Sequence, residues 1–292
     1  HTYNATLNSF TKFSGGQGTE EMLVTDVFTA GKLKEYEAWL RSRNASWNTV
    51  STYMRVLKAV YNRLVEAKHL TYDARLFDSV YTKVEAQSKR SLTEEQMNTL
   101  LRTDFEKLPE DVQNVLAYFL LMFLFRGMPF IDMAYLRKQD LKEHCITYCR
   151  HKTGKKMVVR IPHEATALFE KCRNKKTDSG YLFPILDETT ENEKKLYENY
   201  RQALRTFNRK LAKMAALLLP GTNISSYTAR HTWATLAFYS GIPIGIISKA
   251  LGHSSIKVTE TYLKPFENEK VDAANDELIM SVVKRSKEKI VA

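Results

Sequence analysis

The chain has few cysteines and no pattern that would bind a metal. Its 292 residues include only Cys145, Cys149 and Cys172, an odd and sparse set with no second pair to complete a zinc site. We interpret them as reduced thiols of a cytoplasmic protein. We expect neither a metal nor any other cofactor.

Long apolar runs are also scarce. The strongest run covers residues 115–125 and falls well short of the roughly 20 residues that a membrane-spanning helix needs. Nothing at the N-terminus resembles a secretory signal. The sequence therefore argues against a membrane protein and predicts that residues 115–125 form a buried core helix.

Basic residues, by contrast, are in excess. Lys and Arg number 44 against 33 Asp and Glu, which gives a formal net charge of +11 and a pI of about 9.4. Such an excess suits a polyanion such as nucleic acid, because each cation that neutralises a phosphate releases counterions, although it also fits a merely soluble protein. With 43% hydrophobic residues, the chain can bury a full core and divide in two.

Helical periodicity dominates the N-terminal part. Apolar residues recur at helical spacing over 28–40 and 50–64. Residues 1–18 end in a glycine-rich stretch and predict a flexible arm or an edge element, whereas the charged, aperiodic stretch 85–91 is typical of a linker. We therefore predict a helical domain over residues 1–86 and a second domain over residues 87–292.

The second domain begins with a helix signal. Thr93 and Gln96 form a capping-box signature, and Pro109 starts a helix that carries the apolar run. Further helices are expected over 196–218, 227–240 and 243–251.

Between these helices, residues 145–162 alternate in short runs around Lys152-Thr153-Gly154-Lys155, which predicts a β-hairpin with Lys152 at its tip. The predicted fold class is mostly α with a small β-hairpin or sheet.

Three residues in the last third suit phosphodiester chemistry. Arg230 is followed by His253, directly after Gly252, and Tyr262 comes nine residues later. Arginine presents a rigid fork of donors that matches two phosphate oxygens, histidine adds one more donor, and a tyrosine hydroxyl can act as a covalent nucleophile. Together they make a metal-free way to open a phosphodiester.

The surrounding boxes resemble those of a known family. Tyr-Thr-Ala-Arg-His-Thr at 227–232, Leu-Gly-His-Ser-Ser at 251–255 and Tyr262 are similar to the Arg-His, Gly-His and nucleophile boxes of the tyrosine recombinase (phage integrase) family. The resemblance covers residues from about 20 to 265. It implies a two-domain, C-shaped DNA clamp, with a helical core-binding domain and a catalytic domain, that cuts one strand through a 3′-phosphotyrosyl bond and religates it without ATP.

The resemblance also implies roles for neighbouring residues. Lys152 matches the hairpin lysine that acts as general acid for the leaving oxygen, and Lys155 is its competitor. Tyr227 stands where family members commonly carry a histidine, and we expect it to hydrogen-bond phosphate. His231 is expected to point into the helix packing.

The first arginine box departs from the family pattern. Asp132, Leu136 and Asp140 reproduce its later spacing, which places the expected arginine at Pro129. The nearest arginine is Arg126, and we expect it to be the displaced clamp residue, oriented by Asp132. The alternative is that Arg126 only caps its helix. Boxes of the type Arg-Gly-Met-x-Phe-x-Asp-Met resemble those of recombinases from mobile elements of Bacteroides-type bacteria.

DNA contacts are expected from both domains, because family members clasp DNA between them. The expected DNA-binding residues are Arg41, Arg43, Arg55, Lys58, Arg63, Lys89, Arg90 and Lys155. The cations of the N-terminal domain also fit a merely solvated face. The partners implied are double-stranded DNA, further copies in a homotetramer assembled through the helical segment 267–292, and accessory DNA-bending proteins.

Three functions fit these residues. The first is a site-specific recombinase that integrates, excises or inverts a mobile element. The second is a type IB topoisomerase, which would use the same chemistry with little sequence demand. The third is a sequence-specific DNA-binding protein with impaired catalysis, for which Tyr227 and the displaced Arg126 would be the signs.

Overall fold

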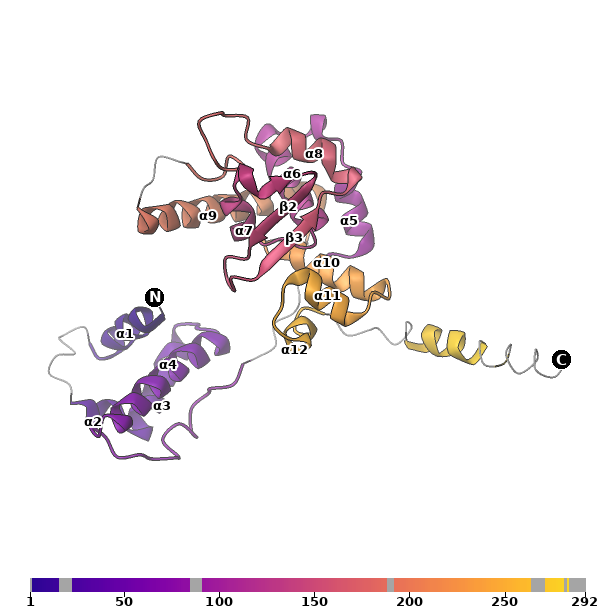
Figure 1. The fold of residues 1–292 in the computed structure, drawn as a ribbon. Coiled ribbons are helices and arrows are strands. Elements are labelled where there is room, and N and C mark those ends of the chain that lie inside the picture. The colour runs from indigo at the N-terminus through magenta and orange to yellow at the C-terminus, as the bar shows by residue number, and fades with distance from the viewer. Residues whose placement is uncertain are drawn as a thin grey trace. The chain divides into compact units, whose positions relative to one another are not determined.

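The protein folds as two compact units, His1–Ser88 and Lys89–Ala292 (Figure 1). The computed structural model describes residues 2–15, 23–84, 91–187, 192–263, 271–280 and 283. Within these ranges the chain is mostly helical with one small sheet, which confirms the predicted fold class. None of the described helices is long and apolar enough to cross a membrane. The domain boundary predicted after residue 86 falls outside the described ranges.

The N-terminal unit is a small helical bundle. Its helices are α1 (Thr2–Phe13), α2 (Val24–Val27), α3 (Ala30–Ser42) and α4 (Trp47–Glu66). Both longer helices begin where a side-chain oxygen accepts a hydrogen bond from a backbone N–H of the first turn: Thr29 caps α3 and Ser46 caps α4. The helices predicted over 28–40 and 50–64 are thereby confirmed.

Residues 2–13 correct the expectation of a flexible arm, because they form the regular helix α1. Phe10 is buried and its ring lies 5.0 Å from that of Tyr36, while the ring of Phe13 lies 5.8 Å from that of Trp39. Aromatic burial against α3 thus holds the segment in place. The glycines mark the end of this helix, where Gly15 has a φ of +95°; residues 16–18 lie outside the described ranges.

Helices also dominate the second unit. They are α5 (Glu94–Leu101), α6 (Glu110–Leu124), α7 (Phe130–Tyr135), α8 (Thr166–Cys172), α9 (Glu193–Leu218), α10 (Thr228–Tyr239), α11 (Ile244–Leu251) and α12 (Ile256–Glu260), with short 3-10 turns η2 (Phe105–Lys107), η3 (Lys138–Asp140) and η4 (His163–Ala165). The apolar helix α6 is the centre, since α5, α8, α9 and α10 all pack against it. The predicted capping box at Thr93 is present, and residues 271–280 are helical.

The predicted hairpin is confirmed as part of a three-stranded antiparallel sheet. Its strands are β1 (Leu141–Lys142), β2 (Cys145–Cys149) and β3 (Lys156–Arg160), in the order β1-β2-β3. Ile146 faces Val159 in the register, and both are buried on the core side. The strand β1 was not expected, because two residues are too few to show an alternating pattern.

Candidate active site

Arg230 is the centre of the candidate site. It lies in the first turn of α10 and is only 2% exposed. Its Nη1 donates to the carbonyl of Gly127 at 2.9 Å, and its Nη2 donates to the carbonyl of Leu251 at 2.5 Å and to Nε2 of His253 at 3.1 Å. The guanidinium is therefore held by the turn before α7, by the end of α11 and by the loop before α12.

The turn before α7 fits Arg230 because it contains a glycine. Gly127 has a φ of +67°, and a Cβ atom at this position would lie 2.9 Å from the Cα atom of Arg230. An L-residue would meet both the backbone strain and the clash. Gly127 thus brings its carbonyl against the guanidinium at a distance that no larger residue allows.

His253 is buried beside Arg230 because α11 stops abruptly. Gly252 closes that helix with a φ of +67°, and the backbone N–H of His253 donates to the Ser248 carbonyl at 3.0 Å. The His253 side chain is 6% exposed. Burial, followed by the nearby charge of Arg230, lowers the pKa of His253 from 6.5 to about 4, so the imidazole is neutral at neutral pH.

The Tyr262 hydroxyl lies in the same site as Arg230 and His253. Its oxygen is 3.4 Å from the Tyr227 hydroxyl oxygen, and Cζ of Arg230 lies 5.6 Å from the centre of the Tyr262 ring. The tyrosine ring lies 4.8 Å from the rings of both His253 and His231. One chain therefore brings the expected nucleophile to its own arginine.

Tyr227 is the residue directly before α10 and remains 39% exposed. Burial of its hydroxyl, followed by the hydrogen bond with Tyr262, raises the pKa of Tyr227 to about 12. The phenol therefore keeps its proton at neutral pH. It can exchange hydrogen bonds with Tyr262 or with a phosphate. It does not serve as a general base at neutral pH, because its phenolate form is scarcely populated there.

Sequence reasoning missed one residue of the site, Arg150. It follows β2 directly, is 5% exposed, and its Nη1 donates to the Gly252 carbonyl at 3.2 Å. Its Nε lies 3.8 Å from Oδ2 of Asp132, which makes an ion pair. The signal was present, because Ile146 and Tyr148 face the core and a period of two places residue 150 on the same face.

Arg126 contacts strand β3 and not the Asp132 carboxylate that was expected to orient it. It has a φ of +59° at the end of α6, and its Nη1 donates to the Val158 carbonyl at 3.3 Å. Asp132 does not orient it, since the carboxylate pairs with Arg150 and accepts a hydrogen bond from the His151 backbone at 2.9 Å. The turn at Arg126 directs its side chain toward β3, which is why the expected pair does not form.

The two hairpin lysines differ in their contacts. Lys155 donates to the carbonyl of His253 at 3.1 Å, whereas Lys152 is exposed in the turn between β2 and β3. The charges of both contribute to the lowered pKa of His253. Both lysines therefore belong to the electrostatic surroundings of the site, and Lys155 is in direct contact with it.

The site carries more positive than negative charge. Burial, followed by the charge of Arg150, lowers the pKa of Arg230. Asp132 is the nearby carboxylate, and burial raises its pKa in spite of the adjacent cations. Burying like charges costs free energy unless an opposite charge compensates them. The arrangement is therefore suited to an anion that enters beside the Tyr262 hydroxyl.

The cations expected to bind DNA in the N-terminal unit form no comparable cluster. All five are exposed, and several lie over aromatic rings: Arg41 over Trp47 at 4.3 Å, Arg43 over Trp39 at 4.5 Å, Lys58 over Phe77 at 5.7 Å and Arg63 over Tyr3 at 5.7 Å, while Arg55 donates to the Ser51 carbonyl. Lys89 and Arg90 lie outside the described residues.

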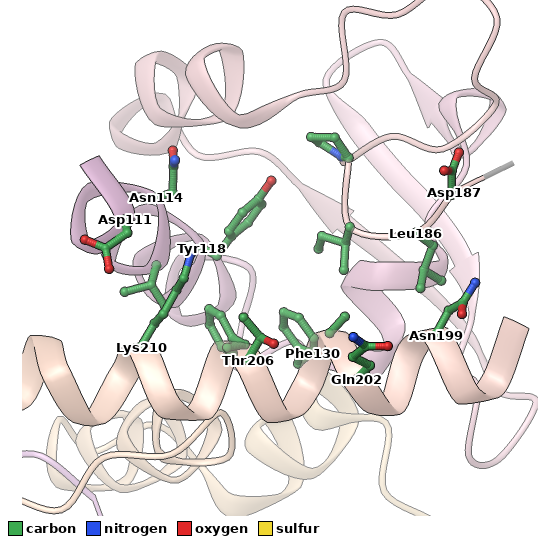
Figure 2. A pocket seen from close by; sticks show the side chains of 15 residues that line it. Asp111, Asn114, Tyr118, Phe130, Leu186, Asp187, Asn199, Gln202, Thr206 and Lys210 are labelled. Atoms are coloured by element: carbon green, nitrogen blue, oxygen red, sulfur yellow. The ribbon is translucent and has the colours of Figure 1, made fainter. Parts of the chain in front are cut away.

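A cavity of about 420 Å³ lies apart from this site, between α6 and α9 (Figure 2). Tyr118 from α6 and Gln202 from α9 are among the residues that line it, with Phe130 at the start of α7. None of the residues expected to act in catalysis or DNA binding lines this cavity.

The chain belongs to the phage integrase family. The model of that family matches residues 90–269, and the model of the phage integrase SAM-like domain matches residues 1–77. Among characterised proteins, the chain is similar to tyrosine recombinase XerA of Pyrococcus furiosus, with 25% identity over 81% of this chain and 76% of that protein. It is also similar to tyrosine recombinase XerC of Rickettsia bellii, with 24% identity over 90% and 85%.

Solved structures share the fold. The Tn1549 transposon integrase in complex with transposon right end DNA has a TM-score of 0.64 at 16% identity, and covers 96% of this chain and 94% of that one. A lambda integrase dimer bound to a core site has a TM-score of 0.63 at 14% identity, over 89% and 86%. The chain is thus a tyrosine recombinase in family and in fold.

Proposed function

We propose that this tyrosine recombinase cleaves and rejoins DNA through Tyr262. The observation that carries the proposal is the position of Tyr262, whose ring centre lies 5.6 Å from Cζ of the buried cation Arg230 and whose ring also contacts His253. In the attack, the phenolic oxygen bonds to phosphorus, the bond to the 5′ oxygen breaks, and the phenolic proton passes to solvent. A 5′ hydroxyl reverses the step, so the energy of the linkage is kept in the phosphotyrosyl bond.

Each cation has a role in this step. The guanidiniums of Arg230 and Arg150 stabilise the charge that gathers on the nonbridging oxygens, and Arg150 takes the part that the sequence assigned to Arg126. A lysine of the hairpin protonates the departing 5′ oxygen. Lys152 is retained for this role on the basis of the family resemblance, and Lys155 supports the His253 loop.

The same proposal assigns roles to the two domains. Residues 1–86 form the core-binding domain, in agreement with the match of the SAM-like model to residues 1–77, and residues 87–292 form the catalytic domain. Exposed cations of α3 and α4 contact the phosphates of double-stranded DNA from the first domain. Lys89 and Arg90 do so from the linker.

We further propose a homotetramer on DNA. A lambda integrase has been solved as a tetramer bound to a Holliday junction, and in this chain residues 271–280 form a helix with exposed Leu278, Ile279 and Met280. This helix supports contacts between protomers through segment 267–292. Accessory DNA-bending proteins would assist, and the free thiols support a site of action in the bacterial cytoplasm.

The biological reaction proposed is integration, excision or inversion of a mobile element. The Arg-Gly-Met-Pro-Phe-Ile-Asp-Met box at 126–133 supports a narrower relation to recombinases from Bacteroides-type mobile elements. The structure gives this box a physical reason. Gly127 fits against Arg230, and Asp132 pairs with Arg150. The box therefore contacts two arginines of the site that lie outside the box itself.

Covalent trapping tests the proposal. The protein is incubated with a library of random duplexes that carry a nick, and DNA that stays bound in detergent is sequenced to find the cleavage site. A suicide substrate is then built on that site. Wild-type protein is expected to accumulate a covalent complex, and Tyr262→Phe to form none while its DNA affinity changes little. A covalent complex with Tyr262→Phe would refute the assignment.

The same substrates separate the other two functions. Relaxation of supercoiled plasmids without the recovered site would indicate a type IB topoisomerase. Site-specific binding without any covalent complex would indicate a DNA-binding protein that has lost catalysis. The position of Tyr262 beside the buried Arg230 favours the recombinase over this last function.

A further inference from the structure

His253 makes two short contacts that together determine where its proton lies. Its Nε2 is 3.1 Å from Nη2 of Arg230, and its Nδ1 is 2.9 Å from Oγ1 of Thr259. An arginine side chain only donates hydrogen bonds, so Nε2 must offer its lone pair to Arg230. The neutral ring then carries its proton on Nδ1 and donates it to the threonine hydroxyl.

Thr259 is buried together with His253 and Arg230. It has no exposed surface, and His253 and Arg230 are 6% and 2% exposed. Water therefore does not compete for the Nδ1 proton, and removing the hydroxyl would leave that N–H buried without a partner. Protonation of both ring nitrogens is also disfavoured, because burial and the adjacent arginine hold the pKa of His253 at about 4.

Thr259 also lies on the helix that leads to the expected nucleophile. It belongs to α12, and the backbone N–H of Tyr262 donates to the Thr259 carbonyl at 2.8 Å. One residue thus holds the histidine through its side chain and the tyrosine through its backbone. The chain of contacts runs from Tyr262 through Thr259 and His253 to Arg230.

We propose that Thr259 is a positioning residue, which keeps His253 in the Nδ1-protonated tautomer so that Nε2 anchors the Arg230 guanidinium, and which links that anchor to the turn that carries Tyr262. In the absence of DNA, His253 is thus an acceptor for the Arg230 guanidinium through Nε2. Its part in strand cleavage, which rests on the function proposed above, includes holding Arg230 in place before the phosphate enters.

The tautomer can be measured without DNA. Nitrogen-15 NMR of the ring distinguishes a protonated Nδ1 from a protonated Nε2, and we expect Nδ1 to be protonated in the wild type and in Thr259→Ser. Thr259→Val, which replaces the hydroxyl by a methyl group of similar size, should shift the proton toward Nε2. A wild-type ring protonated at Nε2, or a Thr259→Val spectrum identical to that of the wild type, would overturn the proposal.

The catalytic arm uses the suicide substrate described above. Thr259→Val should form the covalent complex roughly five- to tenfold more slowly than wild type, as expected for one lost neutral hydrogen bond, and Thr259→Ser should stay close to wild type. Thr261→Val, at an exposed threonine after α12, is the control. A tautomer shift without any change in rate would refute the positioning role. If wild-type protein itself forms no covalent complex, the proposed function fails while the tautomer assignment stands.

Discussion

The two units of this protein use cationic side chains in opposite ways. In the N-terminal unit, Arg41, Arg43 and Arg55 are exposed and rest over aromatic rings or helix carbonyls. In the catalytic unit, Arg150 and Arg230 are 5% and 2% exposed, and they donate to backbone carbonyls that only the fold brings together. Exposed charges attract DNA over a long range, and salt screens this attraction. A buried guanidinium acts only on a group that enters its own site. Binding and chemistry are therefore expected to separate by unit.

The largest effect should come from the buried arginine that sequence reasoning missed. Arg150→Ala is expected to slow covalent complex formation on saturating DNA by about 100-fold, because one preorganised donor to the transition state is lost. Arg126→Ala, at the residue expected from sequence, should slow it by less than about threefold, since its Nη1 contacts a β3 carbonyl. Thermal unfolding of both variants controls for folding. The reverse order of rates would contradict the assignment of Arg150.

The second effect is a pH dependence confined to the catalytic unit. The pKa of His253 is lowered from 6.5 to about 4, so its contribution to stability is complete above pH 6.5 and is lost as the pH falls through about 4. Between pH 7 and pH 5, the wild type should lose about 2 kcal/mol of unfolding free energy relative to His253→Gln. Chemical denaturation of both proteins at the two pH values measures the difference. Equal losses of unfolding free energy in the wild type and in His253→Gln would show that His253 is not held neutral.

A smaller effect should follow from the backbone around Arg230. Gly127→Ala and Gly154→Ala both place an alanine at positive φ, but only the first meets a neighbour, the Cα atom of Arg230 at 2.9 Å. We expect Gly127→Ala to lower the unfolding free energy by about 1 to 2 kcal/mol more than Gly154→Ala. Denaturant titration compares them. Equal losses would mean that the close approach to Arg230 relaxes without cost.

The smallest effect should come from the exposed cations. Arg55→Ala is expected to weaken DNA binding by less than about tenfold and to lower the slope of log affinity against log salt by about 1, as for one phosphate contact. The rate of covalent complex formation on saturating DNA should not change. Binding at several salt concentrations measures the slope. A slower reaction at saturation would show that the N-terminal unit takes part in the chemistry.

The elements of the fold that sequence predicted well are those with long local signals. The apolar run of α6 and the amphipathic pattern of α9 each extend over two or more turns, and the capping box at Thr93 is a specific four-residue signal. Those it missed have short or conflicting signals. Strand β1 has two residues, and the glycines after α1 suggested a loose arm although Phe10 and Phe13 pack on α3.

Sequence by itself determined the chemical groups of the candidate site, since Arg230, Gly252, His253 and Tyr262 stand in a fixed order at fixed spacing, and all four lie within the range that the family model matches. Only the tertiary structure decided which groups meet. The pairing of Asp132 with Arg150 rather than Arg126, the contact of Lys155 with His253 and the contact of His253 with Thr259 all join separate elements. Such contacts depend on how helices and strands pack, because spacing along a chain says little about the direction in which a distant side chain points.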